Sequence, residues 1–133
     1  MRFAFRTAIL IIALVSLINA AWMLAHGWSW FAWIPGVHHT GPANLHLIRD
    51  VGLAYGIFGA SLLWCLRVGA SSYPLFVAAA AFYAGHALGH VVEIITGHLP
   101  HSHWWIDLPL VFLPGMLLLA ACPPPIWKHL HHG

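Results

Sequence analysis

The chain has 133 residues, of which 61% are hydrophobic and 6% charged, with a formal net charge of +2 at pH 7. A soluble domain carries about 25% charged residues, so this composition excludes a water-soluble domain and identifies an integral membrane protein. The small net charge and the absence of a basic run argue against a nucleic-acid partner, which leaves the lipid bilayer as the first expected partner.

Four apolar segments follow one another along the chain, each near the roughly 20 residues that a helix needs to cross a bilayer. Because proline lacks a backbone N–H, the last segment is expected to end before Pro123. The predicted fold is an all-α, four-transmembrane-helix bundle that forms a single domain over residues 1–133. The spans are expected at residues 7–25, 45–66, 74–96 and 106–122.

The first span follows two arginines, as a signal peptide would. It continues apolar and aromatic without a clear cleavage context, so we expect it to remain as a span, followed by a short interfacial helix. If all four segments cross the membrane, the basic residues outside the spans lie on one side, and both termini are then predicted to be cytoplasmic. These residues are Arg2, Arg6, Arg67 and Lys128.

Pairs of glycines stand four residues apart in the second and third spans. Small residues at this spacing let helix backbones approach closely in lipid, so we expect these two spans to pack tightly on each other. The pairs are Gly52 with Gly56 and Gly85 with Gly89.

The second span opens with an unusual concentration of polar residues in a chain that has only eight charges. His46 and Asp50 are four apart and share a helix face, with Arg49 about 60° to one side. Asn44 precedes the span and is well placed to be its N-cap.

Polar residues of the third and fourth spans are predicted at the same outer level. His86, His90 and Glu93 follow the i, i+4, i+7 spacing of one helix face, and Asp107 opens the fourth span. Charges inside a membrane face the bundle interior and pair, so we expect these groups to converge with Arg49 and Asp50 in the outer third of the bundle.

Two interpretations of this convergence remain open. The first is a divalent metal site, because imidazole and carboxylate groups on facing helices bind zinc or iron; copper is less favoured without a nearby thiolate. Its candidate ligands are His46, Asp50, His86, His90 and Glu93. The second is a structural network in which Arg49 pairs with Asp50, Glu93 or Asp107, as in a small accessory subunit of a larger membrane complex.

Other functions are less favoured by the residue pattern. Haem b held by His46 with His86 or His90 is disfavoured, because carboxylates beside the ligands suit a hard cation better. A complete ion path is disfavoured because the polar groups stop in the outer third. No catalytic motif or cofactor fingerprint predicts an enzyme.

The remaining histidines of the two outer loops are weaker candidates. Loops hold histidine at little cost, although the segment from His98 to His103 lies beside the cluster and could gather a metal at the membrane surface. The loop histidines are His26, His38, His39, His98, His101 and His103.

Three motifs make residues 40–115 resemble an uncharacterised family of small bacterial four-span membrane proteins. They are Asn-x-His-x-x-Arg-Asp-x-Gly-x-x-Tyr from Asn44 to Tyr55, His-x-x-x-His followed by an acid at Glu93, and Asp-Leu-Pro from Asp107. The acid after the second histidine is commonly Asp in that family, so Glu93 is a departure. The resemblance implies the four-span topology in a bacterial cytoplasmic membrane but implies no activity. The small size and the glycine pattern leave a membrane-protein partner or a second copy open.

Overall fold

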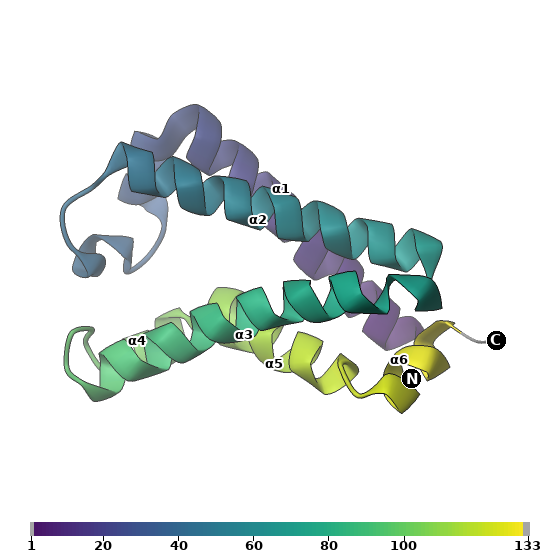
Figure 1. The fold of residues 1–133 in the computed structure, drawn as a ribbon. Helices are drawn as coiled ribbons and strands as arrows, with labels where there is room; N and C mark the ends of the chain where they lie inside the picture. Colours follow the sequence, from purple (N-terminus) through teal and green to yellow (C-terminus); the bar gives the residue numbers. More distant parts are fainter. Residues whose placement is uncertain (1, 132–133) are drawn as a thin grey trace.

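The structure, a computed structural model, describes residues 2–131, and these residues form helices and no strands (Figure 1). The all-helical fold expected from the sequence is therefore confirmed for this part of the chain. The long helices are α1 (Arg2–Trp33), α2 (Leu45–Val68) and α3 (Tyr73–Ile95). The short helices are η1 (Val37–Thr40), η2 (Ala70–Ser72), α4 (His103–Ile106), η3 (Leu108–Phe112), α5 (Leu113–Ala121) and α6 (Pro124–His131).

The three long helices are each apolar and long enough to cross a membrane. A fourth crossing exists only if the two segments Leu108–Ala121 and Pro124–Leu130, which are bent by 93° relative to each other, form one span. The chain is thus a helical membrane protein with three or four potential spans.

The last predicted span, residues 106–122, corresponds to the helical segment Leu108–Ala121, which winds irregularly at its start. Its first part, η3, is a π-helix, in which the carbonyl of Asp107 accepts hydrogen bonds from the N–H groups of Val111 (2.8 Å) and Phe112 (3.1 Å). Proline at position 109 removes one helical donor and favours this irregular winding. The end of the span agrees with the sequence, since α5 stops at Ala121 and Pro124 starts α6, where a missing N–H costs nothing.

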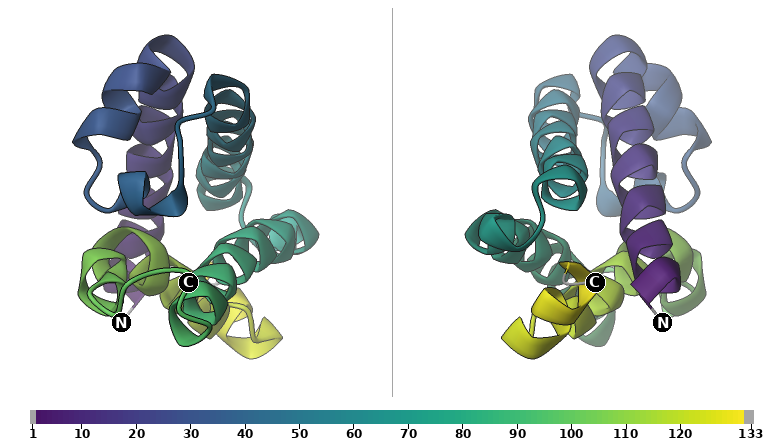
Figure 2. Two further views of the ribbon diagram at one scale, coloured as in Figure 1. Left: turned by 90° about the vertical axis from the view of Figure 1, so that its left-hand side faces the viewer. Right: turned by 90° about the vertical axis from the view of Figure 1, so that its right-hand side faces the viewer.

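Helix α1 is kinked at His26, whose backbone is non-helical (φ −138°, ψ 51°). Beyond the kink its last turns fold back beside the preceding ones (Figure 2). Two indole groups hold this fold: Trp30 Nε1 donates to Asn19 Oδ1 at 2.7 Å, and Trp22 Nε1 donates to Ser29 Oγ at 2.8 Å. The turns after His26 match the short helix that the sequence predicts after the first span.

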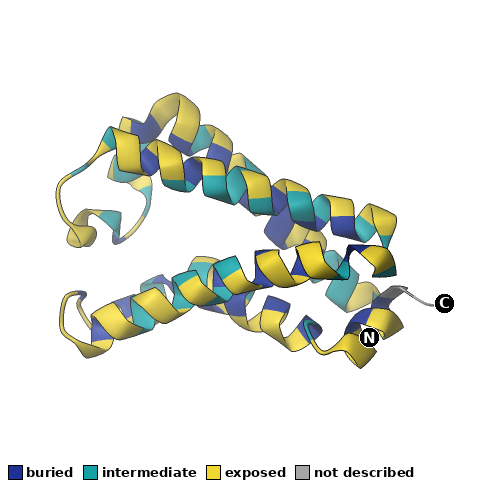
Figure 3. Ribbon diagram, in the orientation of Figure 1, coloured by how far each residue is buried: buried dark blue, intermediate teal, exposed yellow. Residues whose placement is uncertain are grey.

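The helices form two layers, α1 with α2 and α3 with α5, which approach most closely at the end where both described chain ends lie (Figure 1). Buried positions alternate with exposed ones along each long helix (Figure 3), and those of α2 include residues that pack against α1. At the closed end the ring of Trp127 from α6 stacks on Phe76 with centroids 4.2 Å apart, and Arg6 Nη2 donates to the carbonyl of Leu66 at 2.9 Å. That carbonyl lies in the last turn of α2, where a cation complements the helix dipole.

The glycines pack differently from the sequence prediction. A Cβ added to Gly52 would lie 2.9 Å from the Cβ of Met23, and one added to Gly59 would lie 3.1 Å from the carbonyl oxygen of Ala13, both on α1. A Cβ added to Gly85 or Gly89 would have no atom of another element within 4 Å. The predicted tight glycine contact between the second and third spans is therefore wrong, because the glycine face of α2 is turned to α1.

Candidate metal centre

A single helical turn places two polar side chains together at the start of the last membrane segment. His103 begins α4 and Asp107 is the C-cap residue directly after it, so the two are four apart and their side chains share one face. His103 Nδ1 lies 2.8 Å from Asp107 Oδ2, and both side chains are buried, with 2% and 8% of their surfaces exposed. The local sequence therefore brings these two side chains together.

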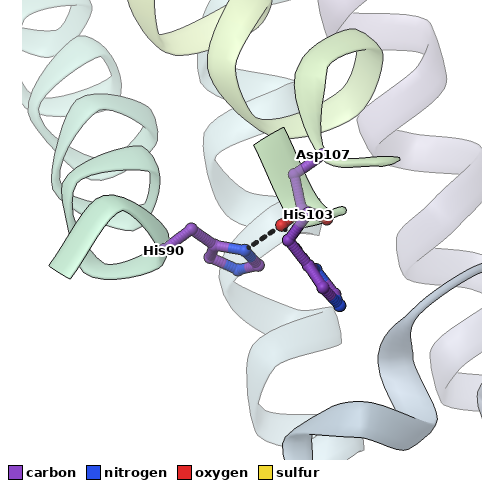
Figure 4. Close-up of side chains that lie close together, drawn as sticks. All are labelled: His90, His103 and Asp107. Carbon is purple, nitrogen blue, oxygen red and sulfur yellow. Dashed lines mark hydrogen bonds and ion pairs between the residues drawn. The ribbon is translucent and has the colours of Figure 1, made fainter. Parts of the chain in front are cut away.

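A third side chain joins the group from α3. His90 Nδ1 lies 2.7 Å from the same oxygen, Asp107 Oδ2, as Figure 4 shows. One potential ligand atom from each of His90, His103 and Asp107 lies within 4.8 Å of the other two. We call these three residues the His–Asp–His group, and among the described residues it is the cluster whose geometry could hold a metal ion.

The connection between α3 and α4 is packed firmly enough to position the group. Its residue Leu99 is buried in a small apolar cluster with Ile94 of α3 and Phe112 of η3. The backbone N–H groups of His98 and Leu99 donate to the carbonyl of Glu93 at 2.8 and 3.0 Å, which closes the end of α3. This packing ties His103 to the helix that carries His90.

A second layer of contacts comes from the loop between α1 and α2. His39 Nδ1 lies 3.0 Å from His103 Nε2. The loop can approach because of Gly36, which has a left-handed φ of +80° and whose added Cβ would lie 2.7 Å from His103 Cε1. A side chain at position 36 would both strain the backbone and displace the imidazole of His103.

One arrangement of protons satisfies all of these contacts with neutral imidazoles. His90 and His103 each donate from Nδ1 to the carboxylate of Asp107, and His103 then accepts at Nε2 from the Nδ1–H of His39. Two donated hydrogen bonds offset part of the cost of burying one carboxylate. When a ring nitrogen binds a metal instead, the proton moves to the other nitrogen of that ring, so His103 would donate to His39.

Two of the sequence-predicted ligands, His46 and Asp50, lie elsewhere. His46 Nε2 is 3.4 Å from Asp50 Oδ2, but 89% and 55% of these side chains are exposed. The inward face of α2 contains Ile48 and Gly52, both buried. Asp50 is two residues from each, which on a helix is the opposite side, so the structure does not bring it to the interior group.

The expected ion pairs of Arg49 are also missing from the structure. Arg49 is exposed, and within residues 2–131 it forms no ion pair with Asp50, Glu93 or Asp107. Glu93 is exposed in the last turn of α3, just before the helix ends at Ile95. Asp107 is the one acidic residue of the three that is buried.

Two other predicted residues, His86 and Asn44, lie close to where the sequence places them. His86 lies one turn from His90, with ring centroids 4.7 Å apart, but among the described residues it forms no hydrogen bond or ion pair with Asp107. The side chain of Asn44 accepts hydrogen bonds from the N–H groups of His46 (3.1 Å) and Leu47 (3.2 Å), so its predicted role as an N-cap is confirmed.

His103 is the site residue that sequence reasoning undervalued. A signal was present, because His103 and Asp107 have the same four-residue spacing as His46 and Asp50. The predicted span began at residue 106, which assigned His103 to a loop and hid the helical turn that it shares with Asp107.

The His–Asp–His group opens onto a cavity of about 560 Å³ between the two helix layers. All three side chains line it, together with His86, and most of the remaining lining is apolar. A cavity of this size suits a drug-sized molecule or several water molecules.

No family model, curated protein or solved structure matches the chain. The function is therefore argued from the geometry of the site.

Proposed function

We propose that this chain is a metal-binding integral membrane protein in which His90, His103 and Asp107 bind one divalent cation. The observation that carries the proposal is the buried carboxylate of Asp107, whose Oδ2 lies 2.7 Å from His90 Nδ1 and 2.8 Å from His103 Nδ1. Two imidazoles and one carboxylate supply three ligands and leave positions open for water or another molecule. Zinc and iron(II) both use such a set, and we propose one of these two metals.

The contact of His39 with His103 supports the same function. Metal-binding histidines commonly use their second ring nitrogen in a hydrogen bond that fixes the orientation and tautomer of the ring. His39 is placed to do this, 3.0 Å from His103 Nε2. The proposed ligand set thus replaces His46, Asp50, His86 and Glu93 with His103 and Asp107, and keeps His90.

The membrane arrangement that we propose is four spans with both termini on the cytoplasmic side of a bacterial cytoplasmic membrane. The bent pair of segments that ends at Leu130 would then count as one span. The side is supported by the basic residues at the closed end of the fold, among them Arg6, which contacts the last turn of α2. The kind of membrane is supported by the family resemblance of the motifs.

The test is the metal content of full-length protein in which the tail histidines, His129, His131 and His132, are replaced by alanine. The protein is purified without a metal-affinity step after growth with zinc, iron and copper available, and its metals are measured by mass spectrometry. We expect close to one zinc or iron ion per chain, and loss of that ion in His90→Ala and in His103→Ala.

Three matched variants sharpen the result. His101→Ala removes an exposed histidine two residues from His103 and should keep the metal, as should His46→Ala at the exposed end of α2. His39→Ala should weaken binding about tenfold or more, because it removes only the orienting contact. If the tail-free protein contains no metal and binds none on titration, the proposal is wrong, and the His–Asp–His group is a structural network of the kind expected in an accessory subunit.

A further inference from the structure

The cavity between the helix layers contains two polar groups that the His–Asp–His group does not use. Tyr55 of α2 and His86 of α3 both line it, with ring centroids 5.8 Å apart. Within residues 2–131 neither the hydroxyl of Tyr55 nor the imidazole of His86 forms a hydrogen bond with another residue. Partly buried polar groups require a partner, so these two side chains offer a donor and an acceptor to whatever occupies the cavity.

The electrostatic character of the cavity restricts that occupant. No lysine or arginine is among its lining residues, all of which are described, and its one carboxylate, Asp107, already accepts two hydrogen bonds. A negatively charged group would lie beside Asp107 without a cation to balance it, and a buried unpaired charge is costly. The polar part of the occupant is therefore not anionic, and an uncharged oxygen fits the donor and acceptor that Tyr55 and His86 offer.

The shape of the cavity indicates an entry route. A smaller hollow of about 210 Å³ lies between α1 and α5 and shares four lining residues with the large cavity, Ile11, Ile12, Pro109 and Pro114. Exposed apolar side chains border this hollow, including Ile11 (56% exposed) and Leu113 (43% exposed). In a membrane these positions face lipid tails, so the hollow that borders the cavity lies against the hydrocarbon interior.

We infer that the cavity binds an uncharged, lipid-soluble molecule with an apolar body and a carbonyl or hydroxyl oxygen. The molecule enters from the bilayer between α1 and α5 and places its oxygen against Tyr55 and His86. Its body lies along the apolar lining, which includes Val15 of α1 and Val51 of α2. The inference concerns residues outside the proposed metal ligands and holds with or without an ion.

The experiment uses the full-length protein in lipid nanodiscs with a chelator present. The probe is a benzoquinone with a ten-carbon alkyl tail, which quenches tryptophan fluorescence, and Trp30 is among the cavity-lining residues. We expect a saturable quenching component above the linear background that partition into lipid produces. Decanol should compete for it, whereas decylbenzene, which lacks the oxygen, and decanoate, which is charged, should compete at least tenfold more weakly.

Variants connect the saturable component with the cavity. Tyr55→Phe keeps the ring and removes one hydrogen bond, so affinity should fall about fivefold. His86→Leu should have a similar effect. Val51→Phe fills part of the cavity and should abolish saturation, whereas Leu53→Phe, at a position on α2 that is 51% exposed and outside the cavity lining, should not.

Several results would overturn the inference. One is quenching that never saturates in the unmodified protein, and another is stronger competition by decanoate than by decanol. Among the variants, the contradicting results are equal quinone affinity in Val51→Phe and Leu53→Phe, and unchanged quinone affinity in Tyr55→Phe and His86→Leu. Because the protein is kept free of metal, none of these results depends on whether His90 and His103 bind an ion.

Discussion

Replacing Asp107 with alanine is expected to destabilise the metal-free protein by about 2–4 kcal/mol. Asp107 accepts hydrogen bonds from His90 (2.7 Å) and His103 (2.8 Å), and only 8% of its side chain is exposed. Hydrogen bonds between side chains in membrane proteins contribute about 0.6–1.7 kcal/mol each. The variant also leaves the N–H of buried His103 without its acceptor, which costs about 1–3 kcal/mol. Removing a buried carboxylate relieves its own desolvation cost, which keeps the net loss below the sum of these figures.

The assay is thermal and denaturant unfolding in detergent with a chelator present, so that bound metal does not contribute. The matched control is Asp50→Ala, because Asp50 also contacts a histidine four residues away but is 55% exposed. Exposed pairs contribute about 0–1 kcal/mol, so this control should unfold close to the unmodified protein. If Asp107→Ala and Asp50→Ala lose the same stability, the reasoning that burial makes the Asp107 contacts valuable is refuted.

Three further predictions follow from the packing and the topology. Gly36→Ala should weaken metal binding and lower stability by about 1–3 kcal/mol, because a Cβ at this left-handed position meets the ring of His103; unchanged metal affinity and melting temperature would contradict it. Gly52→Ala should destabilise by about 1–3 kcal/mol, since its Cβ would meet α1 at 2.9 Å, whereas Gly85→Ala, with nothing within 4 Å, should stay within about 0.5 kcal/mol. Equal unfolding midpoints for these two variants would show that the contact of α2 with α1 tolerates a methyl group. Reporter fusions at the C-terminus should give cytoplasmic signals, and periplasmic activity would reject the proposed orientation.

The helices were predictable because long apolar runs and their end signals are local properties of the sequence. The second and third spans, predicted at residues 45–66 and 74–96, correspond to Leu45–Val68 and Tyr73–Ile95. The last segment was harder, because hydropathy averages over Pro109 and does not register the π-helical turn beside it. Which helices pack against each other could not be predicted either, because a glycine pattern indicates a close neighbouring helix without identifying it.

The residues of the site were harder to predict than the helices. Depth along a helix follows from counting residues, and on this basis Asp50, Glu93 and Asp107 were placed at one level. Direction around the helix axis depends on which neighbour covers each face, and α2 turns Ile48 inward and Asp50 outward. His90 was predictable from its place inside a span, whereas His103 required knowing that the connection after α3 folds into a buried turn.

The three proposed metal ligands come from one short stretch of the chain. His90 and Asp107 are 17 positions apart, and His103 is four positions before Asp107. The proposed ligands therefore follow a simple sequence pattern: a histidine in one apolar helix, then a histidine and an aspartate four residues apart at the start of the next apolar segment. α3 and the segment after it therefore contain all three proposed ligands, whereas the contact that orients His103 comes from His39, outside this segment.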